Sequence, residues 1–261
     1  MAKLGILTVH GMGTPLIDFD NELESGLLKR LNPDFKHSVV FESIFYDSEL
    51  HSNATKLWQR LDGEGLRWDF IRKTFIFGFA DATAFHVKAE DDKGMYFKIN
   101  EIILSSIEAL NQKLDTGAPV VIIAQSLGCQ VISNYIWDAQ RNQGIWHPGT
   151  RIPLSYQKLE NAKLLITTGC NIPLFISGLH VEKLEAIHPL NNEFKWFNYY
   201  DSDDVLGYPL KPLSTGFDNS YNNVVTEDIK LNTGFTPIVA HTNYWRNPKC
   251  LDSMANKINQ L

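Results

Sequence analysis

Short apolar segments alternate along this chain with segments that repeat apolar residues every three or four positions. The clearest apolar segment is Pro119–Ala124 (PVVIIA), which is typical of a strand buried on both faces of a parallel sheet. Lys98–Leu114, just before it, carries isoleucine and leucine at helical spacing. Strands separated by helices predict an α/β fold, with a mostly parallel central sheet and helices on both faces.

The same patterns predict the other elements and the domain count. We expect strands at Leu4–Val9, Ser38–Tyr46, Ala162–Thr167, Phe194–Tyr200 and Glu227–Leu231, and helices at Phe19–Leu31, Gln130–Arg141 and Pro248–Leu261. No internal repeat, low-complexity tract or linker interrupts them. We therefore expect a single domain over residues 1–261.

Charge and cysteine content exclude several classes of protein. The 24 Lys+Arg residues are scattered among 30 Asp+Glu residues, so no nucleic-acid partner is expected. No run of about 18 apolar residues occurs, so no transmembrane segment is expected. The three cysteines are widely spaced and form no C-x-x-C pair. This favours a reducing, cytoplasmic location without a disulfide framework, and no metal site is predicted.

The sharpest chemical motif is the AQSLG segment at residues 124–128, which lies between the apolar strand and the next helix. A nucleophilic serine on such a turn needs a strained backbone. The residues two before and two after it are expected to come so close together that only small side chains fit, and Ala124 and Gly128 meet that need. Ser126 is therefore the predicted nucleophile. The alternative is a serine that merely caps the following helix.

A nucleophilic serine needs a base, and His241 is the preferred one. It lies beyond the last full strand, in a segment expected to be a loop before the terminal helix. His147, His180 and His188 are more typical of surface or capping residues. A buried structural role is the alternative for His241.

Asp201, Asp203 and Asp204 directly follow a predicted strand, where a parallel sheet delivers side chains to a site. One of them is expected to orient the base, and at least two to be structural or exposed. From the residues alone the choice among the three stays open.

The glycine turn after the first strand, HGMG at residues 10–13, supplies the fourth component. We expect the backbone N–H groups of Met12 and Leu127 to form an oxyanion hole, with Gly11 lining the substrate site. A plain tight turn is the alternative. A dinucleotide site is excluded because Pro15 interrupts the position of a third glycine.

Taken together, the motifs resemble those of the α/β-hydrolase superfamily, in particular lipase-like and esterase-like serine hydrolases. The matching segments are VHGMG at 9–13, AQSLG at 124–128, TTGCNIPLF at 167–175, NYYDSDDVLGYPL at 198–210 and HTNYW at 241–245. The resemblance implies the α/β-hydrolase fold, Ser126 as nucleophile, His241 as general base and acid, and Asp204 as the acid, with Asp201 as second choice. It departs from the usual pattern at Ala124, at Gln125 and at Cys170–Asn171.

Residues 50–95 form an aromatic-rich insertion where a short helix would suffice. We expect a cap over Ser126, in which Trp68, Phe75 and Phe77 line an apolar acyl pocket together with Gln125 of the elbow. Ordinary core packing or a homodimer interface is the alternative.

These predictions converge on hydrolysis of a carboxylic ester through an acyl-serine intermediate. The expected substrate is a small-molecule ester or a lipid-like acyl compound, and no cofactor is required. An acyltransferase or a thioesterase would use the same residues. A catalytically silent protein that uses this fold as an interaction module is the alternative of a different class.

Overall fold

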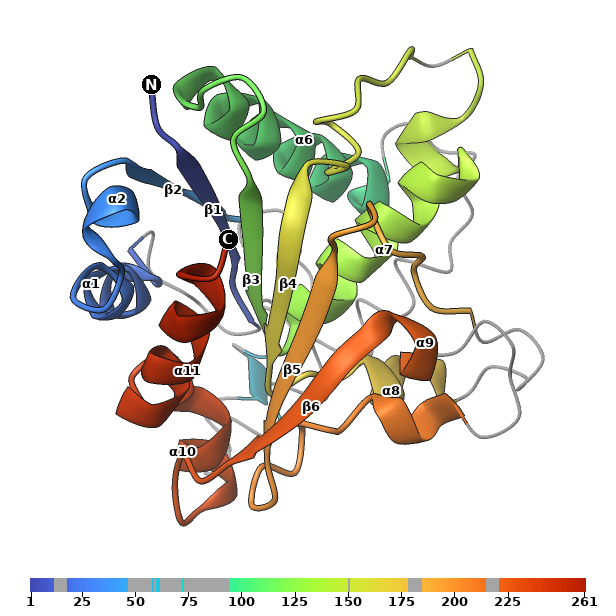
Figure 1. Cartoon of the computed structure of the whole chain (residues 1–261). Coiled ribbons are helices and arrows are strands. Elements are labelled where there is room, and N and C mark those ends of the chain that lie inside the picture. Colours follow the sequence, from blue (N-terminus) through green and yellow to red (C-terminus); the bar gives the residue numbers. More distant parts are fainter. Residues whose placement is uncertain are drawn as a thin grey trace.

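A computed structural model of the protein shows an α/β fold built on a six-stranded, all-parallel sheet (Figure 1). It describes residues 1–11, 18–46, 58, 60–61, 72, 94–149, 151–177, 185–214 and 221–261. The strand order is β2-β1-β3-β4-β5-β6. In chain order the strands are β1 (Leu4–Val9), β2 (Val39–Ile44), β3 (Val120–Gln125), β4 (Ala162–Thr168), β5 (Lys195–Asp201) and β6 (Val225–Leu231).

The longer helices lie on both faces of the sheet (Figure 1). One face is covered by α6 (Met95–Lys113) and α7 (Leu127–Arg141), the other by α1 (Asn21–Leu28) and α11 (Pro248–Ile258). Neighbouring residues of β3 enter opposite cores, because Ile122 packs on the α6/α7 side and Val121 on the α1/α11 side. A strand covered on both faces can be apolar throughout, as PVVIIA is.

Every predicted strand and long helix is present, and the boundaries of all but β1 are shifted. The helix predicted at Phe19–Leu31 ends at Leu28, and a separate short helix follows because the Asn32 side chain accepts a hydrogen bond from the backbone N–H of Phe35. The helix predicted from Gln130 begins at Leu127. The remaining elements are short: α2 (Pro33–Lys36), η2 (Gly144–Trp146), α8 (Ile172–Ile176), η4 (Lys211–Ser214), α9 (Tyr221–Val224) and α10 (Pro237–Thr242).

Some expectations fall on residues that the structure does not describe. The cap predicted at residues 50–95 lies almost wholly outside the described residues, and so do Trp68, Phe75 and Phe77. In the described part of the chain, no helix combines the length and the apolar character needed to cross a membrane. Cys129, Cys170 and Cys250 are all described, and all three are buried free thiols.

The carboxyl ends of the central strands bring four distant segments to one edge of the sheet. In the register of the strands, Val9 lies opposite Ala124, which in turn lies opposite Thr167. On the next strand pair, Thr168 lies opposite Tyr199. Residues 10–11, 126, 169 and 202–204 therefore follow neighbouring strand ends, and Asp201 is the last residue of β5. Ligand sites of open parallel sheets are found at this edge.

Candidate active site

Ser126 occupies a sharp turn between β3 and α7. Its backbone has φ 52° and ψ −122°, a conformation that residues with a side chain rarely adopt. The Ser126 N–H donates to the Thr168 carbonyl at 3.0 Å, which ties the turn to β4. The strained backbone predicted from the AQSLG motif is confirmed.

Gly128 is needed for a reason different from the one expected. A methyl group at this position would lie 2.4 Å from the His10 carbonyl oxygen and 2.7 Å from that of Val9. The crowding therefore comes from the backbone at the end of β1 and just after it, and not from Ala124, which lies at the other end of the motif. Only glycine lets the first turn of α7 approach β1 this closely.

His241 lies in the last turn of α10 and not in the loop that the sequence suggested. The Thr236 side chain caps this helix by accepting from the Val239 N–H, and Pro237 occupies its first turn. A threonine followed by a proline is a helix-start signal, so the sequence carried a clue to α10. His241 is buried, with 3% of its surface exposed.

The imidazole of His241 bridges Ser126 and Asp204. Its Nε2 lies 2.8 Å from Ser126 Oγ, and its Nδ1 lies 2.9 Å and 3.0 Å from Asp204 Oδ1 and Oδ2. A carboxylate accepts hydrogen bonds, so we assign the tautomer with the proton on Nδ1, which donates to Asp204. Nε2 is then the acceptor for the Ser126 hydroxyl, which is the arrangement a general base requires.

The three clustered aspartates have three different environments. Asp204 is buried against His241, and Asp203 is exposed. Asp201 is also buried, but it accepts hydrogen bonds from the N–H and the hydroxyl of Thr233, at 2.5 Å and 2.8 Å. Burial alone would raise the pKa of Asp201, but the hydrogen bonds from Asp203 and Thr233 outweigh it and lower that pKa. Asp201 therefore stays ionised as a structural acceptor.

The turn after β1 is anchored by an aromatic residue that the sequence reasoning did not single out. The His10 ring stacks on Tyr46 at a centroid distance of 4.0 Å, and its Nδ1 lies 2.5 Å from the Gly11 carbonyl oxygen. The Tyr46 hydroxyl donates to the His10 carbonyl at 2.7 Å. A methyl group at Gly11 would lie 2.9 Å from Ser126 Cβ, so this turn closes directly over the serine.

The remaining predicted site residues are distributed as follows. Leu127 is the first residue of α7, so its N–H has no acceptor within the helix. Met12 lies outside the described residues. The Gln125 side chain, expected to line the substrate site, donates from Nε2 to the His241 carbonyl at 2.9 Å. His147 and His188 are exposed, as expected, whereas His180 is not described.

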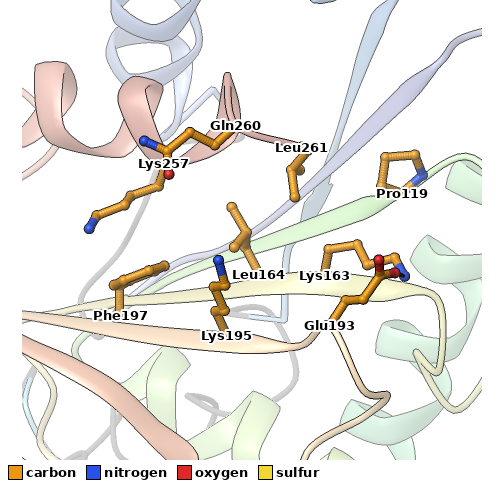
Figure 2. A pocket seen from close by; sticks show the side chains of 9 residues that line it. All are labelled: Pro119, Lys163, Leu164, Glu193, Lys195, Phe197, Lys257, Gln260 and Leu261. Atoms are coloured by element: carbon orange, nitrogen blue, oxygen red, sulfur yellow. Dashed lines mark hydrogen bonds and ion pairs between the residues drawn. The ribbon is translucent and has the colours of Figure 1, made fainter.

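A cavity of about 390 Å³ lies at the other end of the sheet, near the amino ends of β4 and β5 (Figure 2). Its lining includes Lys163, Lys195 and Lys257 together with Phe197, and none of Ser126, His241 and Asp204. Lys163 pairs with Glu193, and Lys257 lies 3.3 Å from Glu227. This cavity is therefore separate from the candidate active site.

No protein-family model matches the sequence, and no curated protein does either. Several solved structures resemble the chain, among them two at low identity. The RedJ thioesterase of the prodiginine biosynthetic pathway in Streptomyces coelicolor has a TM-score of 0.46 and 9% identity, covering 99% of this chain and 86% of that one. ESTFA, in an iron-lacking apo form, has a TM-score of 0.45 and 10% identity, covering 99% of this chain and 75% of that one.

Proposed function

We propose that this protein is a serine hydrolase that cleaves a carboxylic ester through an acyl-Ser126 intermediate. The observation that carries the proposal is the buried hydrogen-bonded series from Asp204 through His241 to Ser126 Oγ. Support also comes from the strained turn that presents Ser126 at the carboxyl edge of the sheet. The thioesterase among the similar structures is too distant to add weight.

The proposed reaction has two half-reactions. Ser126 Oγ attacks the ester carbonyl carbon while its proton passes to His241 Nε2, and Asp204 stabilises the imidazolium that forms. The imidazolium then gives this proton to the departing alkoxide, which leaves as an alcohol. In the second half-reaction a water molecule loses a proton to Nε2 and attacks the acyl carbon. The acid is released, and the proton returns to Ser126.

The negative oxygen that develops in each half-reaction needs backbone donors. The Leu127 N–H at the start of α7 is one proposed donor, and the 15-residue helix adds a favourable dipole at this end. The Met12 N–H is the second proposed donor. The closeness of Gly11 to Ser126 supports that assignment, because Met12 is the next residue after Gly11 in the sequence.

The proposal predicts that Ser126→Ala abolishes turnover of p-nitrophenyl esters. Removing the nucleophile should lower kcat by about 10³-fold or more. The measurement is p-nitrophenolate release, combined with fluorophosphonate labelling located by mass spectrometry. Ser133→Ala, which changes another buried serine of α7, is the matched control and should label like the unmodified protein.

The outcomes separate the alternatives. Labelling at Ser126 together with ester hydrolysis supports the ester hydrolase. Transfer of the acyl group to an added alcohol or amine would instead indicate an acyltransferase. Faster turnover of a thioester than of the matching ester would indicate a thioesterase. A folded protein that neither labels nor turns over any of these substrates would refute the proposal and favour an interaction module.

A further inference from the structure

Tyr244 places a phenol between the two buried aspartates of the site. Its hydroxyl oxygen lies 2.8 Å from the backbone N–H of Asp201 and 2.9 Å from Asp204 Oδ2. The Asp201 N–H can only donate, so the phenol oxygen accepts from it. The single phenol proton therefore points to Asp204. Burial and the neighbouring Asp204 raise the pKa of Tyr244 above its usual range, which keeps that proton in place.

The Asp204 carboxylate is held on both oxygens. Oδ1 accepts from the Leu206 N–H at 2.9 Å, and Oδ2 accepts from Tyr244, while both face His241 Nδ1. The Asp204 side chain has no exposed surface. A methyl group at Gly207 would lie 2.3 Å from Oδ2, so the backbone also closes tightly around this oxygen.

Tyr244 itself sits on a rigid segment. It is fully buried and belongs to the turn between α10 and α11. The neighbouring Trp245 donates from Nε1 to Thr168 Oγ1 at 3.1 Å, and the Asn247 N–H donates to the Asn243 carbonyl at 2.9 Å. The phenol is therefore placed by main-chain and side-chain contacts that do not involve Asp204.

We propose that Tyr244 is a positioning residue that fixes the Asp204 carboxylate against His241. Its hydrogen bond also makes Asp204 a weaker acceptor for the Nδ1 proton of His241. This inference rests on the proposed function and concerns the same site. A donor on Oδ2 withdraws charge from the carboxylate, because hydrogen bonds to one ionised acceptor share its negative charge. Without it, Asp204 would hold the imidazolium form of His241 more strongly, and Oδ2 would lose the donor that fixes its position.

Tyr244→Phe should therefore have two effects on catalysis. The acid limb of the kcat/KM profile should move to higher pH, because a more strongly held imidazolium leaves less neutral base at a given pH. kcat should fall on the order of tenfold, which corresponds to one hydrogen bond to a charged group, with little change in KM. Among the described residues, the titratable groups that face the imidazole or the phenol are Asp204 and Asp201, and the Ser126 hydroxyl contacts the imidazole Nε2.

A readout that needs no turnover tests the same idea. The Nδ1 proton of His241 can be followed as a downfield ¹H resonance in the folded protein. Tyr244→Phe should move it further downfield, since Asp204 becomes a stronger acceptor. Replacing Tyr244 by 3-fluorotyrosine strengthens the phenol as a donor, keeps its volume, and should move the resonance upfield. This second variant also serves if Tyr244→Phe does not fold.

Tyr199→Phe is the matched control. It removes the hydroxyl of another fully buried tyrosine, which contacts Ser253 Oγ at 2.9 Å, and it should change neither the acid limb nor the resonance. A lower kcat in Tyr244→Phe without movement of either readout would make Tyr244 merely structural and overturn the inference. If the unmodified protein fails to label at Ser126, the proposed function fails, and the two opposite resonance shifts still decide the role of Tyr244.

Discussion

At the scale of single residues, the site depends on backbone positions that most side chains would disfavour. Ser126 carries a positive φ of 52° in a turn fixed by its N–H bond to Thr168. Such conformations cost of order 1–3 kcal/mol and persist only where the surroundings enforce them. The strain at Ser126 is consistent with a functional requirement, because a glycine would relieve it.

This strain predicts that Ser126→Gly is more stable to urea than Ser126→Ala, by about 1 kcal/mol. Both variants lose the hydroxyl, but only glycine removes the strain, and its extra freedom in the unfolded chain offsets part of the gain. The comparison is made by urea unfolding, with both variants inactive toward esters. Equal stabilities would mean that Ser126 is not strained.

At the scale of elements, the candidate site is assembled by short connections between strands and helices. Asp201 at the end of β5 binds Thr233 after β6, and the Thr233 carbonyl accepts from Asn243 Nδ2 at 2.7 Å, just past α10. Gln125 adds a bond to the His241 carbonyl. These contacts hold α10, and with it His241, against the end of β3.

The close approach of α7 to β1 predicts a severe effect of Gly128→Ala. Its methyl group would meet the backbone carbonyls of Val9, the last residue of β1, and of His10, which follows it. These carbonyls cannot rotate away, so we expect the free energy of unfolding to fall by more than about 2 kcal/mol and most esterase activity to be lost. Gly26→Ala is the control, because its methyl group would meet only the end of the Leu251 side chain. Gly26→Ala should lower the free energy of unfolding less than Gly128→Ala does, because the Leu251 side chain can move and alanine has a higher helix propensity than glycine. Urea midpoints of both variants decide the comparison.

At the scale of the whole molecule, the two covered faces of the sheet bury a few polar groups that link the helices. Asp138 of α7 accepts a hydrogen bond from the Tyr96 hydroxyl of α6. Burial raises the pKa of Asp138 to about 6, although Tyr96 and Arg141 act in the opposite direction. The folded protein therefore binds this proton more tightly than the unfolded chain, whose ordinary value is 3.8.

Stability should consequently fall as pH rises from about 4 to about 6, because the folded state releases the Asp138 proton only at the higher pH. Asp138→Asn removes this contribution. We expect the variant to be more stable than the unmodified protein at pH 7, by roughly 1–3 kcal/mol, with the difference vanishing near pH 4. Urea unfolding between pH 4 and 7 measures this difference in the free energy of unfolding. The control is Asp34→Asn, at an exposed carboxyl, which should leave the dependence of stability on pH unchanged. A difference that persists at pH 4 would contradict the assignment.

Most helices and strands of the fold could be predicted from the sequence, because the apolar pattern that indicates each element lies within that element. β1 was predicted with its observed limits, and PVVIIA marked a strand buried on both faces. The helix end at Leu28 and the short helix α10 were missed, because capping by Asn32 and by Thr236 competes with apolar spacing. The start of α7 at Leu127 was also missed, by three residues.

The sequence by itself determined the alternation of strands and helices, the turn at Ser126, and three aspartates that could serve a histidine. The family resemblance favoured Asp204, but only the tertiary structure decided which aspartate faces His241, and it is Asp204. Asp201 and Asp204 are three residues apart and equally buried, but one points to the loop after β6 and the other to α10. The structure alone also brought Tyr46 and Tyr244 to the site, since each acts through a partner distant in the sequence. Such long-range contacts follow from the packing of the sheet, and no local pattern encodes them.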